Sequence, residues 1–321
     1  MKAKNKIPEL FEVEQLADQY SHFLRTEKLA EVTGHGYTMP VYGLTMGSKD
    51  PKAPTFGLFG GVHGLERIGT HVLISYLKTL LYRMSWEKEW QKFFEECRLV
   101  SMPIINPLGM ALSRRGNGNN VDLMRNSPMD ATGKLVPLIS GHRYSDKIPW
   151  YRGTDGEPMQ IESQAVVDFC EREFFQSQQV ITLDLHSGFG LKDRLWYPWS
   201  TSMTPFPQEP EVLRLKNLFE KTYPYHIYII EHQSINYTNH GDLWDWIFSR
   251  YLEKNPHGRF LPLTLEMGSW MWVKKNPWQV FSYDGLFNPV KKHRYARTMR
   301  RHQHLLEFLL KASLNHDAWI K

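Results

Sequence analysis

Three polar side chains follow apolar stretches of this 321-residue chain in a pattern that could hold a metal ion. His63 and Glu66 stand in GGVHGLERIG, directly after the apolar run 56–62, and His186 follows a second apolar run, 180–185, in ITLDLHSG. Two imidazoles and one carboxylate can bind zinc and leave its fourth position open for water, as catalytic zinc sites do. Taken alone, a His and a Glu at this spacing are more often a surface pair, so the rest of the chain must decide.

A fourth residue adds the acid–base chemistry that such a centre needs. Glu266 ends a third apolar run, 260–265, within LTLEMG. A carboxylate beside activated water can take its proton as the water attacks a carbonyl, and can then pass that proton to the leaving group. A salt-bridged strand end is the alternative interpretation of Glu266 by itself.

The elements that must position these residues alternate along the chain. Apolar runs predict buried strands over 56–62, 98–105, 180–185, 226–230 and 260–265, and helical periodicity predicts helices over 67–82, 159–175, 211–223 and 242–252. Such alternation predicts an α/β fold with one doubly wound, mixed but mostly parallel sheet and helices on both faces. The carboxyl ends of its strands would then bring the four residues into one crevice.

The remaining segments bear on domain organisation. A helix is expected over 8–27 and a hairpin over 30–47, which together form an N-terminal extension, about 1–50, packed on a single catalytic domain spanning 1–321. Roughly thirty irregular residues lead up to Pro158, a length that is usual for functional or disordered loops.

The composition indicates in which cellular compartment the protein is expected and which classes of partner are disfavoured. Cys97 and Cys170 each lie in an apolar segment, which favours buried free thiols and a reducing compartment. Neither a secretory apolar segment nor a run of about 18 apolar residues is found, so we expect a cytoplasmic protein without a membrane partner. Residues 291–304 hold six Lys and Arg and no acid, more than the whole net charge of +5. A solvated helix face is the expected reason, and without a nucleic-acid motif a nucleic-acid partner is disfavoured.

Five motifs occur in a telling order: HGLE, NPLG, VDLMRN, DLHSG and TLEMG. This series resembles the successive motifs of the M14 family of zinc metallocarboxypeptidases, over about two thirds of the chain. The resemblance implies one zinc ion held by His63, Glu66 and His186, and it assigns the general-base role to Glu266. It also implies that Asp122 hydrogen-bonds the first histidine ligand and fixes its tautomer.

The same resemblance implies roles in substrate binding. Arg125 corresponds to the arginine that receives the terminal carboxylate of the substrate. Either Arg114 or Arg115 corresponds to the arginine that polarises the scissile carbonyl, and the spacing leaves this choice open. Met124 departs from the family, which usually has asparagine before this arginine, and this puts strict recognition of a free C-terminus in doubt.

Two further residues lie in NYTNHGDLWDW. Tyr237 corresponds to the mobile tyrosine that closes over substrate, and Trp244 falls where the side-chain pocket of the family is set. Trp244 fits core packing equally well, so both interpretations stand.

These assignments predict a zinc metallopeptidase that cleaves an amide bond and releases a C-terminal residue from a peptide. An N-acyl amino-acid deacylase of the succinylglutamate desuccinylase and aspartoacylase branch is the alternative, because that branch shares the GGxHGxE opening, DLxR, DLH and a late glutamate. Either substrate, a peptide or an N-acyl amino acid, would carry a carboxylate. A catalytically silent relative that binds metal or nucleic acid is a third possibility, against which Glu266 weighs.

Overall fold

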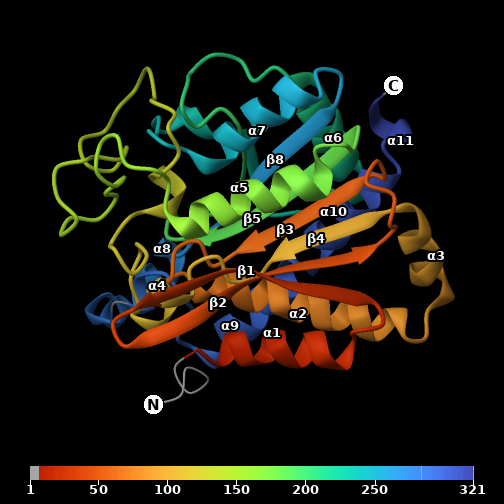
Figure 1. Ribbon diagram of the computed structural model, residues 1–321, viewed down its shortest axis with the longest axis horizontal. Coiled ribbons are helices and arrows are strands. Elements are labelled where there is room, and N and C mark those ends of the chain that lie inside the picture. Colours follow the sequence, from red (N-terminus) through yellow and green to blue (C-terminus); the bar gives the residue numbers. More distant parts are fainter. Residues whose placement is uncertain (1–6, 283, 321) are drawn as a thin grey trace.

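An eight-stranded sheet forms the centre of the computed structural model, which describes residues 7–282 and 284–320 (Figure 1). The strands lie in the order β1-β2-β4-β3-β5-β8-β6-β7. Their bounds are β1 Leu24–Gly34, β2 Tyr37–Gly47, β3 Thr55–Gly60, β4 Arg98–Met102, β5 Gln179–Ser187, β6 Arg194–Tyr197, β7 Ile229–His232 and β8 Arg259–Met267.

Most neighbouring strands in this sheet run parallel. The pairs β3–β4, β3–β5, β5–β8 and β6–β7 are parallel, whereas β1–β2, β2–β4 and β6–β8 are antiparallel. This confirms the predicted mixed, mostly parallel sheet. The hairpin formed by β1 and β2 is hydrogen-bonded to the parallel core through β4, so it is the edge of the same sheet.

Helices cover the sheet from both sides: in Figure 1, α5 crosses in front of it and α10 lies behind it. The α-helices are α1 Pro8–Gln19, α2 Arg67–Met84, α3 Lys88–Glu96, α4 Pro107–Ala111, α5 Ile161–Phe174, α6 Glu209–Thr222, α7 Leu243–Lys254, α8 Trp270–Lys275, α9 Lys292–Arg301, α10 Gln303–Leu314 and α11 Asp317–Ile320. Short 3-10 helices span η2 Leu123–Arg125, η3 Gln233–Ile235, η4 Pro277–Phe281 and η5 Asp284–Leu286. Among the described helices, none is both long and apolar enough to cross a membrane.

The central strands are apolar along their whole length because both of their faces are covered. Every residue of β3 and of β5 is buried, and Phe56, Leu58 and Phe59 are fully enclosed. A strand in this position reads as a continuous apolar run rather than as an alternating one. That is why the sequence located these strands, while it missed β6, which is only four residues long.

The predicted helix over 8–27 is wrong at its C-terminal end. Helix α1 stops at Gln19, where the backbone N–H of Tyr20 closes onto the carbonyl of Leu16, and a short turn leads directly into β1. Leu24 has apolar spacing that fits a helix, but its buried side chain belongs to the first position of a strand paired with β2. Strand pairing overrides the local helical pattern at this point.

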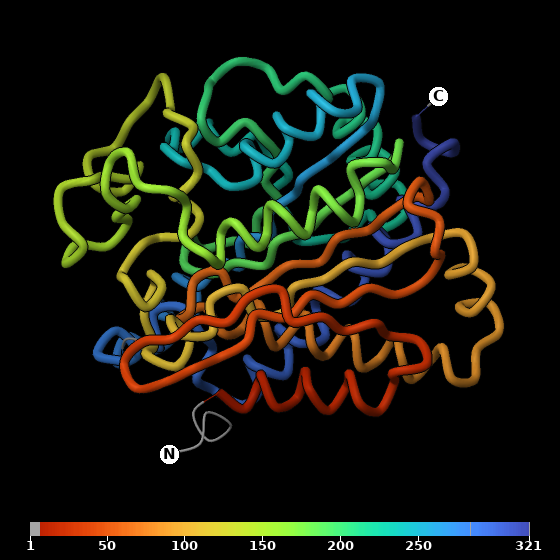
Figure 2. The backbone as a smooth tube through the Cα atoms, viewed as in Figure 1, coloured from red at the N-terminus to blue at the C-terminus, as the bar shows by residue number. Residues whose placement is uncertain are grey.

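The long loop before α5 lies to one side of the sheet, as the yellow-green trace at the left of Figure 2 shows. Between η2 and α5 the chain forms two isolated bridges, one of which joins His142 to Tyr151 and the other Leu135 to Thr238. Its predicted irregularity is therefore correct, and its position next to the carboxyl ends of the strands matters for the site.

Candidate active site

Strand ends bring the three predicted ligands together. In the parallel pairing of β5 with β8, His186 lies directly beside Glu266, and the neighbouring strand β3 ends three residues before His63. The turn between His63 and Glu66 needs a glycine, because a Cβ on Gly64 would lie 2.0 Å from the backbone carbon of Gly109. The close approach of α4 thus fixes the HGLE turn, and α2 begins directly after Glu66.

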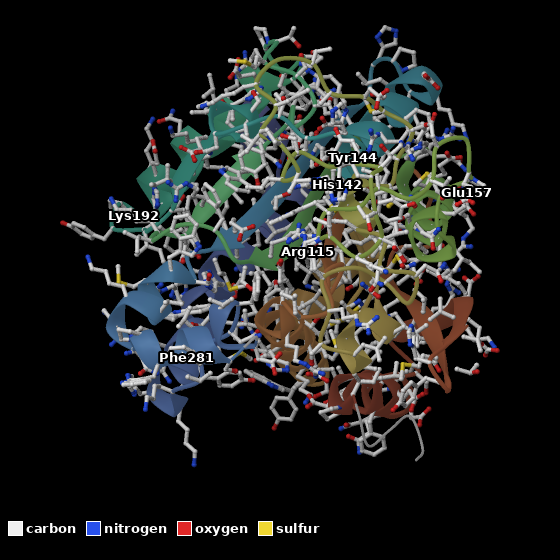
Figure 3. All side chains as sticks on the ribbon, turned by 90° about the vertical axis from the view of Figure 1, so that its left-hand side faces the viewer. Arg115, His142, Tyr144, Glu157, Lys192 and Phe281 are labelled. Atoms are coloured by element: carbon white, nitrogen blue, oxygen red, sulfur yellow. The ribbon has the colours of Figure 1, made fainter. Side chains whose placement is uncertain are left out.

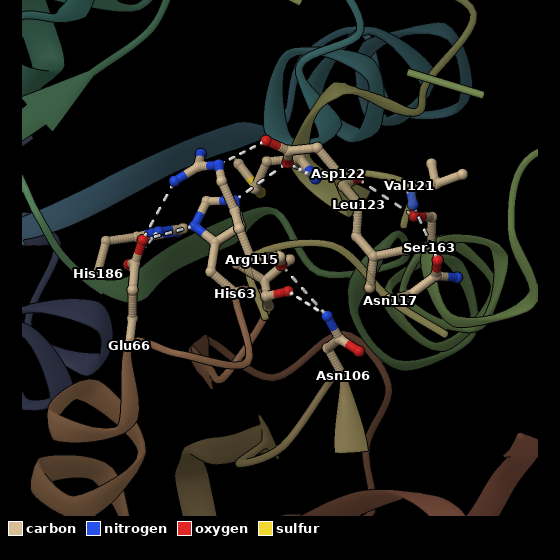
Figure 4. A network of polar contacts seen from close by, with 12 residues as sticks. His63, Glu66, Asn106, Arg115, Asn117, Val121, Asp122, Leu123, Ser163 and His186 are labelled. Atoms are coloured by element: carbon tan, nitrogen blue, oxygen red, sulfur yellow. Dashed lines mark hydrogen bonds and ion pairs between the residues drawn. The ribbon is translucent and has the colours of Figure 1, made fainter. Parts of the chain in front are cut away.

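The three side chains surround one point in a buried pocket (Figure 4). Nδ1 of His63 lies 2.9 Å from Oε1 of Glu66, and Nδ1 of His186 lies 3.3 Å from Oε2 of the same carboxylate. One candidate ligand atom from each residue falls within 4.8 Å of the other two. The exposed fractions are only 3% for His63, 3% for Glu66 and 5% for His186.

The other nitrogen of each imidazole is held by a carboxylate. Nε2 of His63 lies 3.1 Å from Oδ1 of Asp122, and Nε2 of His186 lies 2.8 Å from Oδ2 of Asp184. Each ring is therefore held with its Nδ1 facing Glu66. Metal-binding histidines are usually oriented in this way, by a carboxylate on the nitrogen that does not bind the metal. The contact of Asp122 matches its predicted place, whereas Asp184 was not predicted. Its position two residues before His186 on one strand puts both side chains on one face, a signal that the sequence contained.

Arg115 joins this network and Arg114 does not. Nε of Arg115 donates to Asp122 at 2.8 Å, and Nη1 donates to Glu66 at 3.3 Å. The guanidinium of Arg114 instead donates to Asn120. The side-chain amide of Asn106, from the NPLG motif, donates to the carbonyl of Val62 and so ties the start of α4 to the HGLE turn.

The electrostatics of the cluster favour a cation at its centre. Burial opposes ionisation of Glu66, but the charge of His63 and the hydrogen bonds of both histidines hold its pKa well below the usual range. Asp122 is likewise buried, yet Arg115 and His63 keep its pKa low. Burial, together with the neighbouring Glu66, raises the pKa of Glu266 to about 8. Each of these carboxyl groups is enclosed, and the donor set of two imidazoles and a carboxylate suits Zn²⁺, so the residues fit the implied ion.

A cavity of about 410 Å³ opens onto the cluster. It is lined by the predicted residues His63, Glu66, Arg115, Met124, Arg125, His186, Tyr237 and Glu266. A concave site of this size with a few polar groups among apolar side chains is typical of a small-molecule or peptide-end pocket. Arg114 and Trp244 are not among its lining residues in the described part of the chain.

Arg125 lines the wall of this cavity, and its backbone packs closely against Gly241. A Cβ on Gly241, which has a φ of +68°, would lie 1.9 Å from the carbonyl oxygen of Arg125, so only glycine fits beside it. The Arg125 side chain is 5% exposed, and its Nε has no hydrogen-bond partner among the described residues. Met124 flanks it with an apolar side chain, and Asp242, which caps the start of α7, lines the cavity as well.

Comparison with known proteins decides the family. Residues 12–269 match the sequence model of the family described as zinc carboxypeptidase. The chain belongs to this zinc carboxypeptidase family. The assignment confirms the predicted family and the predicted class, a zinc metallopeptidase.

The individual relatives found for this chain are distant in sequence. Carboxypeptidase D of Mus musculus is 27% identical over 151 residues, which cover 44% of this chain and 9% of the relative, and carboxypeptidase SOL1 of Arabidopsis thaliana is 35% identical over 75 residues, which cover 23% and 15%. The chain thus spans less than a fifth of the length of these two relatives. The structure of bovine thrombin-activatable fibrinolysis inhibitor in complex with tick carboxypeptidase inhibitor covers 95% of both chains at 17% identity, with a TM-score of 0.66, which shows a shared fold.

The rim of the cavity was largely missed by the sequence analysis. The irregular loop supplies Val136, Ile139, Pro149 and Trp150, and Trp270 and Phe287 come from the segment after β8. The guanidinium carbon of Arg115 lies 5.9 Å from the ring centre of Trp150, and Figure 3 shows Arg115 near the middle of this face. Because these segments follow no periodic pattern, no signal in the sequence directed their side chains to the site.

Trp244 lies behind His186, one of the three predicted metal ligands. Its indole N–H donates to Oδ2 of Asp184 at 2.9 Å, and its ring meets Phe59 edge to face with the centres 4.8 Å apart. Only 3% of Trp244 is exposed. This placement favours the packing interpretation over the pocket interpretation and adds a supporting contact to the partner of His186.

Proposed function

We propose that this chain is a zinc-dependent carboxypeptidase that hydrolyses the last amide bond of a peptide and releases the C-terminal residue. His63, Glu66 and His186 would hold one zinc ion. When bound, zinc supplies Lewis acidity, which lowers the pKa of water and polarises a carbonyl. The substrate is a peptide with a free carboxylate, and an N-acyl amino acid is the competing substrate class.

The observation that carries this proposal is the state of Arg125. Its guanidinium is buried, faces the same cavity as Glu266, and has no ion-pair partner within the described residues. Asp122 and Asp242 interact with the charge of Arg125 from farther away, but neither is in ion-pair contact with it, and a buried charge without a direct partner is costly. A terminal carboxylate fits the planar fork of guanidinium and would complete this pair. Met124 adds no polar group, so recognition of the carboxylate falls to Arg125.

The other residues divide the chemistry among themselves. The backbone N–H of Phe189 donates to Oε1 of Glu266 at 2.9 Å, which fixes the carboxyl group while Oε2 accepts no hydrogen bond from a described residue. The raised pKa of Glu266 would fall again beside a bound cation, and the ionised carboxylate then takes a proton from the attacking water and returns it to the leaving amine. Arg115, whose N–H groups point into the cluster, stabilises the developing oxyanion. Tyr237 covers the substrate from the cavity wall.

Paired substrates test the proposal. The purified zinc-loaded protein is assayed against peptides with free and with amidated C-termini and against N-acyl amino acids. We expect release of single C-terminal residues from the free peptides only. The variant Arg125→Gln should lower kcat/KM on free peptides by roughly a hundredfold or more, because breaking a buried charge pair costs about 2–5 kcal/mol.

Arg114→Gln is the matched control, since it removes the same charge from a residue outside the cavity, and its kcat/KM should stay near that of the parent. Cleavage of N-acyl amino acids alone would contradict the peptidase proposal. Equal cleavage of free and amidated peptides would contradict the role of Arg125.

We also propose a cytoplasmic location, which two free and buried cysteines, Cys97 and Cys170, support. Fractionation of the source cells followed by immunodetection should recover the chain in the cytosolic fraction. Recovery from a secretory compartment would contradict this location.

A further inference from the structure

A second cavity, of about 340 Å³, lies between α8, α9 and the segment 191–193. It shares no lining residue with the active-site cavity. In Figure 3, Lys192 of this segment lies at the left edge of the view, well away from Arg115. Five cationic side chains line the cavity: Lys192, Lys275, Arg294, Arg297 and Arg301.

Few of these charges are balanced by the protein. Asp193 is the acidic residue of the lining, and its Oδ2 already accepts a hydrogen bond from Arg301 at 3.0 Å, while its Oδ1 accepts one from the backbone of Gly268 at 2.9 Å. Arg294 donates to the carbonyls of Trp272 and Lys275, which are neutral. Within the described residues no carboxylate forms an ion pair with Lys192, Lys275, Arg294 or Arg297.

Cations gathered around a hollow repel one another and attract a compact anion. The cavity lies near the lower end of the size range of small-ligand pockets, too small for a folded acidic segment but large enough for one or two phosphate groups. Guanidinium and ammonium groups together are the usual partners of phosphate oxygens. We propose that this basic cavity binds a phosphate-bearing anion. The binding is independent of the hydrolytic function.

Two sources could supply such a phosphate: a soluble phosphorylated compound or the headgroup of a phosphorylated lipid. The lipid source has its own support next to the cavity. Helix η4 follows α8 directly and carries Trp278, which is 79% exposed, and Phe281, which is 81% exposed. Exposed aromatic side chains beside a basic surface are typical of contact with an anionic membrane surface.

Calorimetric titration with inorganic pyrophosphate tests the shared chemistry. The zinc-loaded full chain should bind one pyrophosphate at low salt, and the affinity should fall as salt is added. The double variant Lys275→Gln, Arg297→Gln should bind about tenfold more weakly or worse, because it removes two charge-assisted contacts from the cavity. Arg300→Gln, on the same helix but outside this cavity, is the matched control and should bind like the parent.

The controls distinguish binding in this cavity from misfolding of the variants and from binding at another site. The variants change half-exposed or exposed side chains, and their thermal unfolding midpoints are compared with that of the parent to verify folding. Equal binding by the parent and the double variant would assign the pyrophosphate to another site, such as the zinc centre, and overturn the proposal. Sedimentation with phosphatidylcholine vesicles, with and without a phosphatidylinositol phosphate, distinguishes the sources: phosphoinositide-dependent binding identifies the lipid, and pyrophosphate binding alone identifies the soluble compound. Binding to neither probe overturns the proposal.

Discussion

Two buried glutamates near the start of α2, Glu66 and Glu9, contact the same kinds of side chain, yet the two clusters that they form differ in charge balance and in access to a cavity. Glu66 contacts two histidines and Arg115, and Glu9 of α1 contacts His71 at 2.8 Å and Arg67 at 2.6 Å. Both carboxylates are almost fully buried. By residue type alone, either cluster could be taken for a metal or catalytic site.

Charge balance and access distinguish the two clusters. In the Glu9 cluster one carboxylate meets one arginine and one histidine, so its charges cancel within the protein, and none of the three residues lines the active-site cavity. Around Glu66 the histidines also contact Asp122 and Asp184, so when the imidazoles are neutral, as metal binding requires, three carboxylates contact only one cation among the described residues, Arg115. An excess of negative charge beside a cavity is what a cation site requires, whereas the balanced cluster of Glu9, Arg67 and His71 joins α1 to α2.

The largest difference between the clusters should appear in turnover. Glu266→Gln removes the proposed general base, and we expect kcat to fall by roughly 10²–10⁴, which is the usual contribution of a positioned acid or base. Zinc content and the thermal unfolding midpoint should stay close to those of the parent. Glu9→Gln is the counterpart from the balanced cluster and should keep kcat near the parent value.

Steady-state kinetics with a free-carboxylate peptide, together with metal analysis of the same preparations, give both readouts. Unchanged kcat in Glu266→Gln would contradict the general-base role. Loss of zinc from Glu266→Gln would show that the residue acts on the metal rather than on a proton.

A smaller effect is expected from the carboxylates behind the histidines. Asp122→Asn and Asp184→Asn should each weaken zinc binding by about 10–100-fold, because such partners fix the ring and raise its basicity. Trp244→Phe removes the N–H that donates to Asp184 and part of the buried ring, but it leaves the carboxylate on His186, so its loss of affinity should be several-fold smaller. Competition with a chelator of known affinity measures all three. Equal zinc affinity in Asp184→Asn and the parent would restrict the supporting role to Asp122.

These two clusters also show how far the sequence predicts the site. Strand ends could be located from buried apolar runs, so His63, His186 and Glu266 were placed correctly in one crevice. The partners of Glu9 could not be found in this way, because His71 is 62 positions away and nothing in the local pattern pairs them. Contacts between separate helices depend on packing, which periodicity does not encode.

The residues that the sequence could not place lie in irregular segments, where no periodic pattern shows which side chain faces the site. Arg114 and Arg115 are adjacent in an irregular stretch, where no strand or helix period decides which one faces inward, and the structure directs Arg115 to Glu66 and Asp122. Trp150 lies in the long loop, whose path depends on tertiary contacts such as the bridge between His142 and Tyr151. The central strands and the helices α2, α5, α6 and α7 were therefore predictable apart from their ends, whereas α3, α10, β6 and the cavity rim were not predicted.

The smallest expected effect concerns stability: the Glu9 cluster should make the free energy of unfolding depend on pH in the acid range. Burial opposes ionisation of Glu9, but the hydrogen bond of His71 and the charge of Arg67 outweigh it and lower the pKa of Glu9 from 4.5 to about 2. An acid with a lowered pKa in the folded state stabilises the protein fully above its unfolded pKa, and this stabilisation is lost as pH falls through the folded pKa. The free energy of unfolding should therefore fall by about 3 kcal/mol between about pH 5 and pH 2 on account of Glu9. Urea unfolding of the parent and of Glu9→Gln across this range measures the difference, which should be greatest near pH 5 and vanish near pH 2. A constant difference over the whole range would mean that Glu9 stabilises the contact between α1 and α2 by packing rather than by charge.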